Sequence, residues 1–184
     1  MEVLEQIRRI IDGNLIYCLP FTIISLMLIE LFFNNKFKTK IVLNWIRWII
    51  ISYTAIILIS FIVGMLINPQ EYAIVNRATG DYKWAYWVMS FCTLILPLSL
   101  LNNKLAKRGL YVLAISILMK IGFYLERFTI VTTSFHRDYN TSQGFDFKII
   151  FNGIVIPLIQ GVIIAFVFLF FAQVYKREPK KVNY

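Results

Sequence analysis

Long apolar stretches separated by short polar segments dominate the chain. They cover residues 15–33, 46–67, 84–101, 110–131 and 149–175. Each is close to the roughly 20 apolar residues that a helix needs to cross a bilayer. The pattern therefore predicts an all-α integral membrane protein with about five transmembrane helices, which form a bundle over residues 15–175.

Both ends of the chain are more polar than these stretches. In residues 1–14 apolar side chains recur at helical spacing among charged ones, which predicts an amphipathic N-terminal segment lying at the interface. Residues 176–184 carry four basic residues against Glu178 and form a predicted basic cytoplasmic tail.

Prolines and small residues predict local features inside the apolar stretches. Pro20 falls in the first turns of its span, where proline is best tolerated, and Pro97 predicts a kink in the third span. Gly153 and Gly161 suit the close approach of another helix, and Gln160 is expected to form an interhelical hydrogen bond.

Composition agrees with the membrane interpretation and limits the chemistry. Hydrophobic residues make up 59% of the chain and charged residues 16%, whereas soluble domains average about 45–50% and about 25%. A soluble globule and a disordered chain are both excluded. The single histidine, His136, excludes a bis-histidine haem within the chain, and the two distant cysteines, Cys18 and Cys92, make an iron–sulfur or zinc site very improbable. No metal ligands and no covalently bound cofactor are expected.

The net charge of +9 is distributed unevenly between the two predicted sides of the membrane. The side with the N-terminus and the loops of residues 68–83 and 132–148 has seven basic and eight acidic residues, counting Glu126 and Arg127 with it. The opposite side has eleven basic residues against Glu178 alone. The positive-inside rule then predicts an inner-membrane protein with a periplasmic N-terminus and a cytoplasmic C-terminus. Nucleic-acid binding is disfavoured because the charge is split among short juxtamembrane segments.

Candidate chemistry gathers in the fourth span and the loop that follows it. Lys120 lies halfway along the span, where a basic group is costly unless it is paired or hydrated, and it shares a helix face with Tyr124 and Arg127. Structural pairing or snorkelling of Lys120 towards an interface is the alternative to a polar conduit. The full set of candidates for quinol binding or a proton path is Lys120, Tyr124, Glu126, Arg127, His136, Arg137 and Asp138.

Two stretches carry a family resemblance. Residues 76–91 read Asn-Arg-Ala-Thr-Gly-Asp-Tyr-Lys-Trp-Ala-Tyr-Trp-Val-Met-Ser-Phe, and residues 122–138 read Gly-Phe-Tyr-Leu-Glu-Arg-Phe-Thr-Ile-Val-Thr-Thr-Ser-Phe-His-Arg-Asp. In this order they resemble segments of the NrfD/polysulfide-reductase family of membrane subunits, most of all the C-terminal half of the ActC subunit of alternative complex III, a quinol:cytochrome c oxidoreductase.

The resemblance implies a four-helix-bundle-like core, equivalent to half of an NrfD-type subunit. It implies a membrane subunit of a respiratory quinol-oxidising complex that binds quinone or menaquinone and lipid, beside haem and iron–sulfur subunits. The first stretch then supplies a structural or docking loop of Asn76, Arg77, Gly80, Tyr82, Trp84 and Trp87. The chain departs from the family in having about five spans rather than eight to ten, and in Lys120, which replaces an expected asparagine.

Two other functions stay open at the level of sequence. The chain can be a non-catalytic accessory or assembly subunit that keeps the family's packing motifs. A small transporter or channel is less favoured, because its usual sign, paired broken helices in repeated halves, is not visible in the sequence.

Overall fold

The computed structural model describes residues 6, 9–33, 36–67, 78–80, 83–125, 128 and 151–175. Over these residues the backbone forms helices and short turns, and no strand. Four helical runs are long and apolar enough to cross a membrane: Arg9–Phe33, Thr39–Ile67, Lys83–Leu101 and Gly153–Val174. The protein is therefore an all-α, multi-pass membrane protein.

The remaining predicted span, residues 110–131, is only partly described. It contains the shorter apolar helix α8 (Gly109–Leu118), then a turn at residues 119–120 and a further helical segment at 121–125. The predicted single helix is thus interrupted in the middle, and five of its last six residues lie outside the described residues.

The second span begins earlier than its hydropathy predicts. Helix α3 (Thr39–Ile67) has 29 residues and starts seven residues before the predicted boundary at 46. The backbone carbonyl of Lys38 accepts hydrogen bonds from the N–H groups of Ile41 and Val42, at 3.0 and 3.4 Å, and so begins the helix within a polar stretch. At about 1.5 Å per residue, α3 is about 44 Å long, which exceeds the roughly 30 Å hydrocarbon core and requires tilt or protrusion.

The chain forms two compact units. The first comprises Met1–Ile46 and Phe147–Tyr184, and the second comprises Arg47–Asp146. The first contains η1 (Asp12–Ile16), α2 (Leu19–Phe33), η4 (Phe151–Val155) and α11 (Ile156–Tyr175). Helix α3 begins in the first unit and continues in the second.

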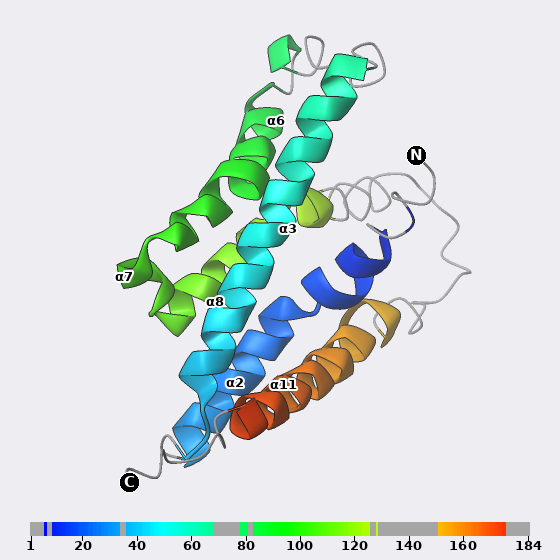
Figure 1. The fold of residues 1–184 in the computed structure, drawn as a ribbon. Helices are drawn as coiled ribbons and strands as arrows, with labels where there is room; N and C mark the ends of the chain where they lie inside the picture. The colour runs from blue at the N-terminus through cyan, green and yellow to red at the C-terminus, as the bar shows by residue number, and fades with distance from the viewer. Residues whose placement is uncertain are drawn as a thin grey trace, which may run out of the picture. The chain divides into compact units, whose positions relative to one another are not determined.

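Helices α2 and α11 lie side by side, although they come from opposite ends of the sequence (Figure 1). The buried positions of α11 follow one another every three or four residues and are mostly small: Pro157, Gly161, Ala165, Leu169 and Ala172. Within this seam of buried positions, Gly161 lies directly against Phe21 and Thr22 of α2. Small residues allow two helix backbones to approach closely, which is how membrane helices associate without a hydrophobic driving force.

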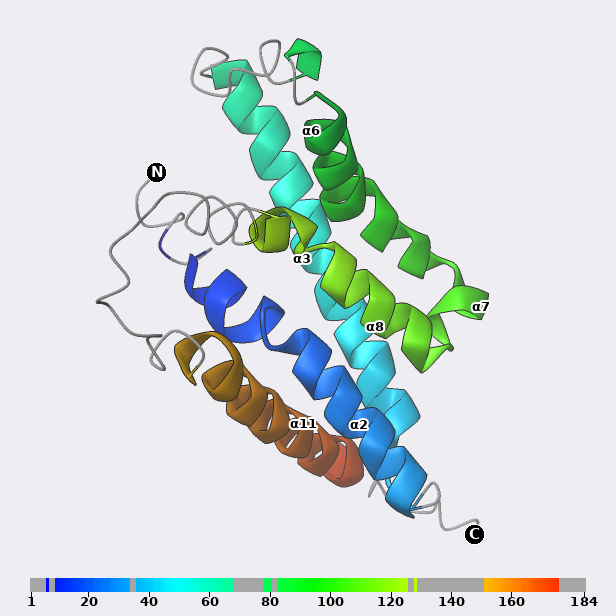
Figure 2. The ribbon, with the colours of Figure 1, turned by 180° about the vertical axis from the view of Figure 1, so that it is seen from behind.

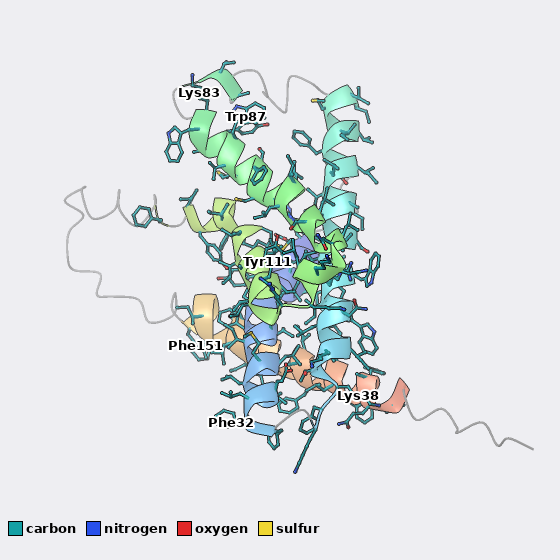
Figure 3. The ribbon with its side chains drawn as sticks, turned by 90° about the vertical axis from the view of Figure 1, so that its left-hand side faces the viewer. Phe32, Lys38, Lys83, Trp87, Tyr111 and Phe151 are labelled. Carbon is teal, nitrogen blue, oxygen red and sulfur yellow. The ribbon has the colours of Figure 1, made fainter. Side chains whose placement is uncertain are left out.

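The residue that precedes α3 contacts the C-terminal end of α11. The ammonium group of Lys38 donates to the carbonyl oxygens of Ala172 and Gln173, at 3.5 and 3.4 Å (Figure 3). A cation at this position satisfies carbonyl groups that have no partner within the helix and interacts favourably with its dipole.

The second unit contains an interrupted helical run that turns sharply and returns. The run consists of α6 (Lys83–Ser90), η2 (Phe91–Ile95) and η3 (Leu96–Leu101). After α7 (Asn103–Ala106), helix α8 comes back along η3 and η2 (Figure 2). The hydroxyl groups of Ser99 and Tyr111 are hydrogen-bonded across this pair at 2.7 Å.

A proline explains the irregular turn in three of the four candidate spans. Pro20, Pro97 and Pro157 each follow a π-helical segment that contains the residue four positions earlier, respectively Ile16, Thr93 and Gly153. Proline cannot donate to that carbonyl, and its ring crowds it, so the preceding turn widens. The helix is irregular around Pro97, where a kink is predicted, and the irregular turns before Pro20 and Pro157 are of the same kind.

Candidate functional site

Lys120 and Tyr124 are the two candidates for quinol or proton handling that the structure describes. Lys120 is partly buried in the turn that follows α8, and its carbonyl accepts a hydrogen bond from the N–H of Tyr124 at 3.1 Å. This bond joins residues one helical turn apart, so both lie on the same face, as the spacing predicts. The rings of Phe123 and Tyr124 are edge to face, with centroids 5.9 Å apart.

Most of the other candidates lie outside the described residues. These are Glu126, Arg127, His136, Arg137 and Asp138 of the second motif, and Asn76, Arg77 and Tyr82 of the predicted docking loop. Their roles stay predictions.

The described part of the docking loop is organised around the first turns of α6. The carbonyl oxygen of Gly80 accepts from the N–H of Lys83 at 3.0 Å, and the indole Nε1 of Trp87 donates to the carbonyl of Ala78 at 3.3 Å. Trp84 and Trp87 are 64% and 58% exposed. In Figure 3, Lys83 and Trp87 lie at one end of their helical run, away from Tyr111 of α8. Two exposed indoles and a cation at a helix end are typical of a membrane interface.

The two family-like stretches meet within the second unit. A Cβ atom placed on Gly122, in the second stretch, would lie 2.6 Å from Cε of Met89, in the first. The absence of a side chain at residue 122 therefore lets the Met89 thioether lie directly over the backbone. Residues 33 positions apart in the sequence, one from each motif, are thus in van der Waals contact.

Lys120 also lies next to the helix interruption that Pro97 causes. The hydroxyl of Thr93, in η2, donates to the carbonyl of Met89 at 2.8 Å and approaches the carbonyl of Met119 at 3.4 Å. Two interrupted helices are therefore adjacent at the residue before Lys120. Side-chain hydroxyls commonly satisfy backbone groups that a broken membrane helix leaves unpaired.

A polar cluster in the first unit was not among the predicted site residues. The hydroxyl of Tyr17 donates to the carbonyl of Gly153 at 3.0 Å, which is the carbonyl that Pro157 leaves without its helical donor. The thiol of Cys18 donates to Oε1 of Gln160 at 3.2 Å. The interhelical hydrogen bond expected of Gln160 is thereby confirmed. Pro157 was the sequence signal for the Tyr17 contact. A proline leaves the carbonyl four residues earlier, here that of Gly153, without its helical donor, so another donor is needed there.

Arg47 lies at the start of the second predicted span and was also not among the predicted site residues. Its side chain is buried, its Nη2 donates to the carbonyl of Leu101 at 3.0 Å, and its guanidinium lies 5.4 Å from the ring centre of Trp48. Arg47 therefore holds the C-terminal end of η3 and serves packing rather than solvation.

The described residues offer no group of three or more His, Cys, Asp or Glu side chains able to hold a metal ion. Their polar chemistry consists of an amine, hydroxyls, indoles and backbone carbonyls, which can bind a hydrogen-bonding ligand or pass a proton. Comparison with protein-family models, with curated proteins and with solved structures finds no match to this chain.

Proposed function

We propose that this chain is a membrane subunit of a respiratory quinol-oxidising complex of the alternative complex III type, in which it contributes to quinol or proton handling or to assembly. The observation that carries the proposal is the contact between Gly122 and Met89. The two motifs that resemble the NrfD family are far apart in sequence, and a shared function requires them to be close in space. Their packing within one unit supports that requirement.

The proposal assigns distinct roles to the residues of the two motifs. Arg127, His136, Arg137 and Asp138, with Glu126, line a quinol site or a proton exit near the outer face. Lys120 and Tyr124 lie one turn apart on the helix that leads towards that face and extend the polar path into the membrane. Asn76, Arg77, Gly80, Tyr82, Trp84 and Trp87 form a docking loop for outer subunits. Electrons pass to haem and iron–sulfur centres in partner subunits, so this chain needs no metal of its own.

Purification from native membranes in a mild detergent tests membership of such a complex. We expect haem and iron–sulfur subunits in the eluate, identified by mass spectrometry and by a haem spectrum. A full-length NrfD-type subunit in the same eluate would make this chain an additional subunit. Its absence would mean that this chain supplies the family's membrane role itself, and the lack of any redox partner would contradict the proposal.

Substitutions in the second motif separate quinol handling from assembly. We expect Arg127→Ala and His136→Ala to lower quinol turnover at least about 100-fold, the lower end of the range for a positioned acid–base group, while the complex stays assembled. Quinol-dependent cytochrome reduction per purified complex is the measurement. Arg108→Ala, a basic residue on the other predicted side, serves as the control and should leave turnover unchanged. Loss of assembly with normal turnover per remaining complex would favour the accessory role.

The three proline-linked helix breaks favour a small transporter or channel as the second candidate function. Discontinuous helices expose backbone groups that can bind substrates and ions in transporters. The described spans contain three irregular turns of this kind, each before a proline. A chain that purifies without redox partners would leave this function in place.

The proposed location is the inner membrane, with the N-terminus in the periplasm and the C-terminus in the cytoplasm. The asymmetry of basic residues between the two sides supports this orientation. We expect a reporter enzyme that works only in the cytoplasm to be active when it is fused after Tyr184. A matched reporter placed in the loop of residues 132–148 should behave in the opposite way. A periplasmic signal after Tyr184 would contradict the charge argument.

A further inference from the structure

The turn between η3 and α8 presents three basic side chains to the surroundings. Residues 102–109, here called the basic corner, include Lys104, Lys107 and Arg108, and all three side chains are exposed. Among the described residues none of these three side chains forms an ion pair or a hydrogen bond. Three cations within five residues therefore leave most of their charge available to an outside partner.

The backbone of the basic corner is held in a compact form. The side-chain oxygen of Asn102 accepts from the N–H of Lys104 at 3.0 Å, and its carbonyl accepts from the N–H of Ala106 at 3.1 Å. The N–H of Arg108 donates to the carbonyl of Leu105 at 3.1 Å, and Ala106 is buried. The three cations are thus displayed from an ordered turn, which lowers the entropic cost of binding a ligand between them.

Exposed apolar residues stand on both sides of the basic corner. Leu101 is 55% exposed and Leu110 is 69% exposed. Each ends or begins an apolar helical run, so each belongs at the edge of the hydrocarbon layer. The Leu101 carbonyl is fixed by Arg47, whose guanidinium lies against the indole of Trp48, a residue type that favours the headgroup level. The corner therefore lies where phospholipid headgroups meet acyl chains.

This part of the chain has no internal source of negative charge. Residues 82–125 contain no Asp or Glu. The described part of the second unit, from Arg47 onwards, contains none either. No carboxylate in the described part of this unit is therefore available to balance the basic corner, and a lipid phosphate is the anion present at this depth.

We propose that the basic corner is a binding site for the headgroup of an anionic phospholipid. Lys104, Lys107 and Arg108 donate to the phosphate and the neighbouring headgroup oxygens, while Leu101 and Leu110 contact the acyl chains. The site is independent of the respiratory role, because none of its residues belongs to the two family-like motifs.

Lipid selectivity of the full chain tests this site. The purified protein is reconstituted in phosphatidylcholine bilayers, and its association with spin-labelled phosphatidylglycerol and spin-labelled phosphatidylcholine is measured by electron paramagnetic resonance. One basic residue near a membrane surface favours anionic lipid about fivefold. We expect the wild type to prefer the anionic lipid by about tenfold or more, and Lys104→Gln/Lys107→Gln/Arg108→Gln to lose that preference.

A matched variant distinguishes lipid binding at the basic corner from a general attraction of anionic lipid by the net charge of the protein. Lys36→Gln/Lys40→Gln/Lys83→Gln removes the same charge from three exposed positions elsewhere and should retain the preference. The conservative variant Lys104→Arg/Lys107→Arg/Arg108→Lys should retain it too, which shows that a loss does not come from misfolding. Equal losses in the two glutamine variants, or a wild type without preference for the anionic lipid, would overturn the proposal.

Discussion

Replacing Gly161 by alanine is expected to destabilise the protein by about 2–3 kcal/mol, in the upper range for overpacking a close contact. A Cβ atom at this position would lie 2.6 Å from Cβ of Phe21, 3.0 Å from the backbone nitrogen of Thr22 and 3.1 Å from the carbonyl oxygen of Cys18. Backbone atoms and a Cβ atom cannot rotate away, so α2 and α11 must separate. The separation also weakens the nearby hydrogen bond between Cys18 and Gln160.

Reversible unfolding in mixed detergent micelles, followed by helicity, measures this effect. Two other glycines provide matched controls. Nothing lies within 4 Å of a Cβ atom at Gly153, so Gly153→Ala should be neutral or slightly stabilising. At Gly122 the atom in the way is the end of the Met89 side chain, which can rotate, so Gly122→Ala should cost less than about 1 kcal/mol. A Gly161→Ala protein as stable as the wild type would contradict the close packing of α2 and α11.

Replacing Lys120 by methionine is expected to lower the apparent free energy of inserting residues 105–131 into a membrane by about 3 kcal/mol. Lysine at the centre of a membrane helix costs about 2.5–3.5 kcal/mol on the insertion scale, whereas methionine costs little. The turn at residues 119–120 places this cost at the point where α8 is already interrupted. The measurement is the fraction of a reporter protein that inserts this segment, read from glycosylation sites on both sides.

Lys107→Met is the control for this experiment, because the same change is made in the basic corner near the edge of the segment. Its effect should be under about 1 kcal/mol, since the cost of a charge falls steeply towards the interface. Equal effects of the two substitutions would show that Lys120 does not lie at the centre of the membrane.

The same substitution in the assembled complex distinguishes the two interpretations of Lys120. If the amine takes part in quinol or proton handling, Lys120→Met should reduce turnover in an assembled complex. If the amine only satisfies neighbouring groups, turnover per complex should stay at the wild-type level. If the charge of Lys120 is functional, the apolar substitution should favour membrane insertion and remove activity.

The sequence was sufficient for the features that depend on hydropathy and on single residues. The apolar stretches identified the four long helices, because a helix satisfies its backbone hydrogen bonds within a single spanning segment. Pro97 indicated a kink, because proline removes one helical hydrogen bond wherever it stands. The spacing of Lys120 and Tyr124 indicated a shared face, because helical geometry relates residues four apart.

Contacts between residues far apart in the sequence could not be predicted from hydropathy or from single residues. Gly153 and Gly161 looked equivalent in the sequence, but only at Gly161 would an added Cβ atom meet another helix. Arg47 is charged and lies at the edge of a predicted span, but it is buried and bonded to Leu101, which is 54 residues away. The hydroxyl of Tyr17 meets the carbonyl of Gly153 across 136 residues. No local pattern encodes contacts of this range.

What the sequence by itself determined is which segments are helical and membrane-spanning, where proline bends them, and how charge is distributed between them. Only the tertiary structure decided which faces are buried, which helices pair and which polar groups meet. The physical reason is that lipid tails are as apolar as a protein core, so a lipid-facing position and a buried one select the same residues. Leu169 and Phe170 are neighbours on α11 and equally apolar, but the first is 4% exposed and the second 65%.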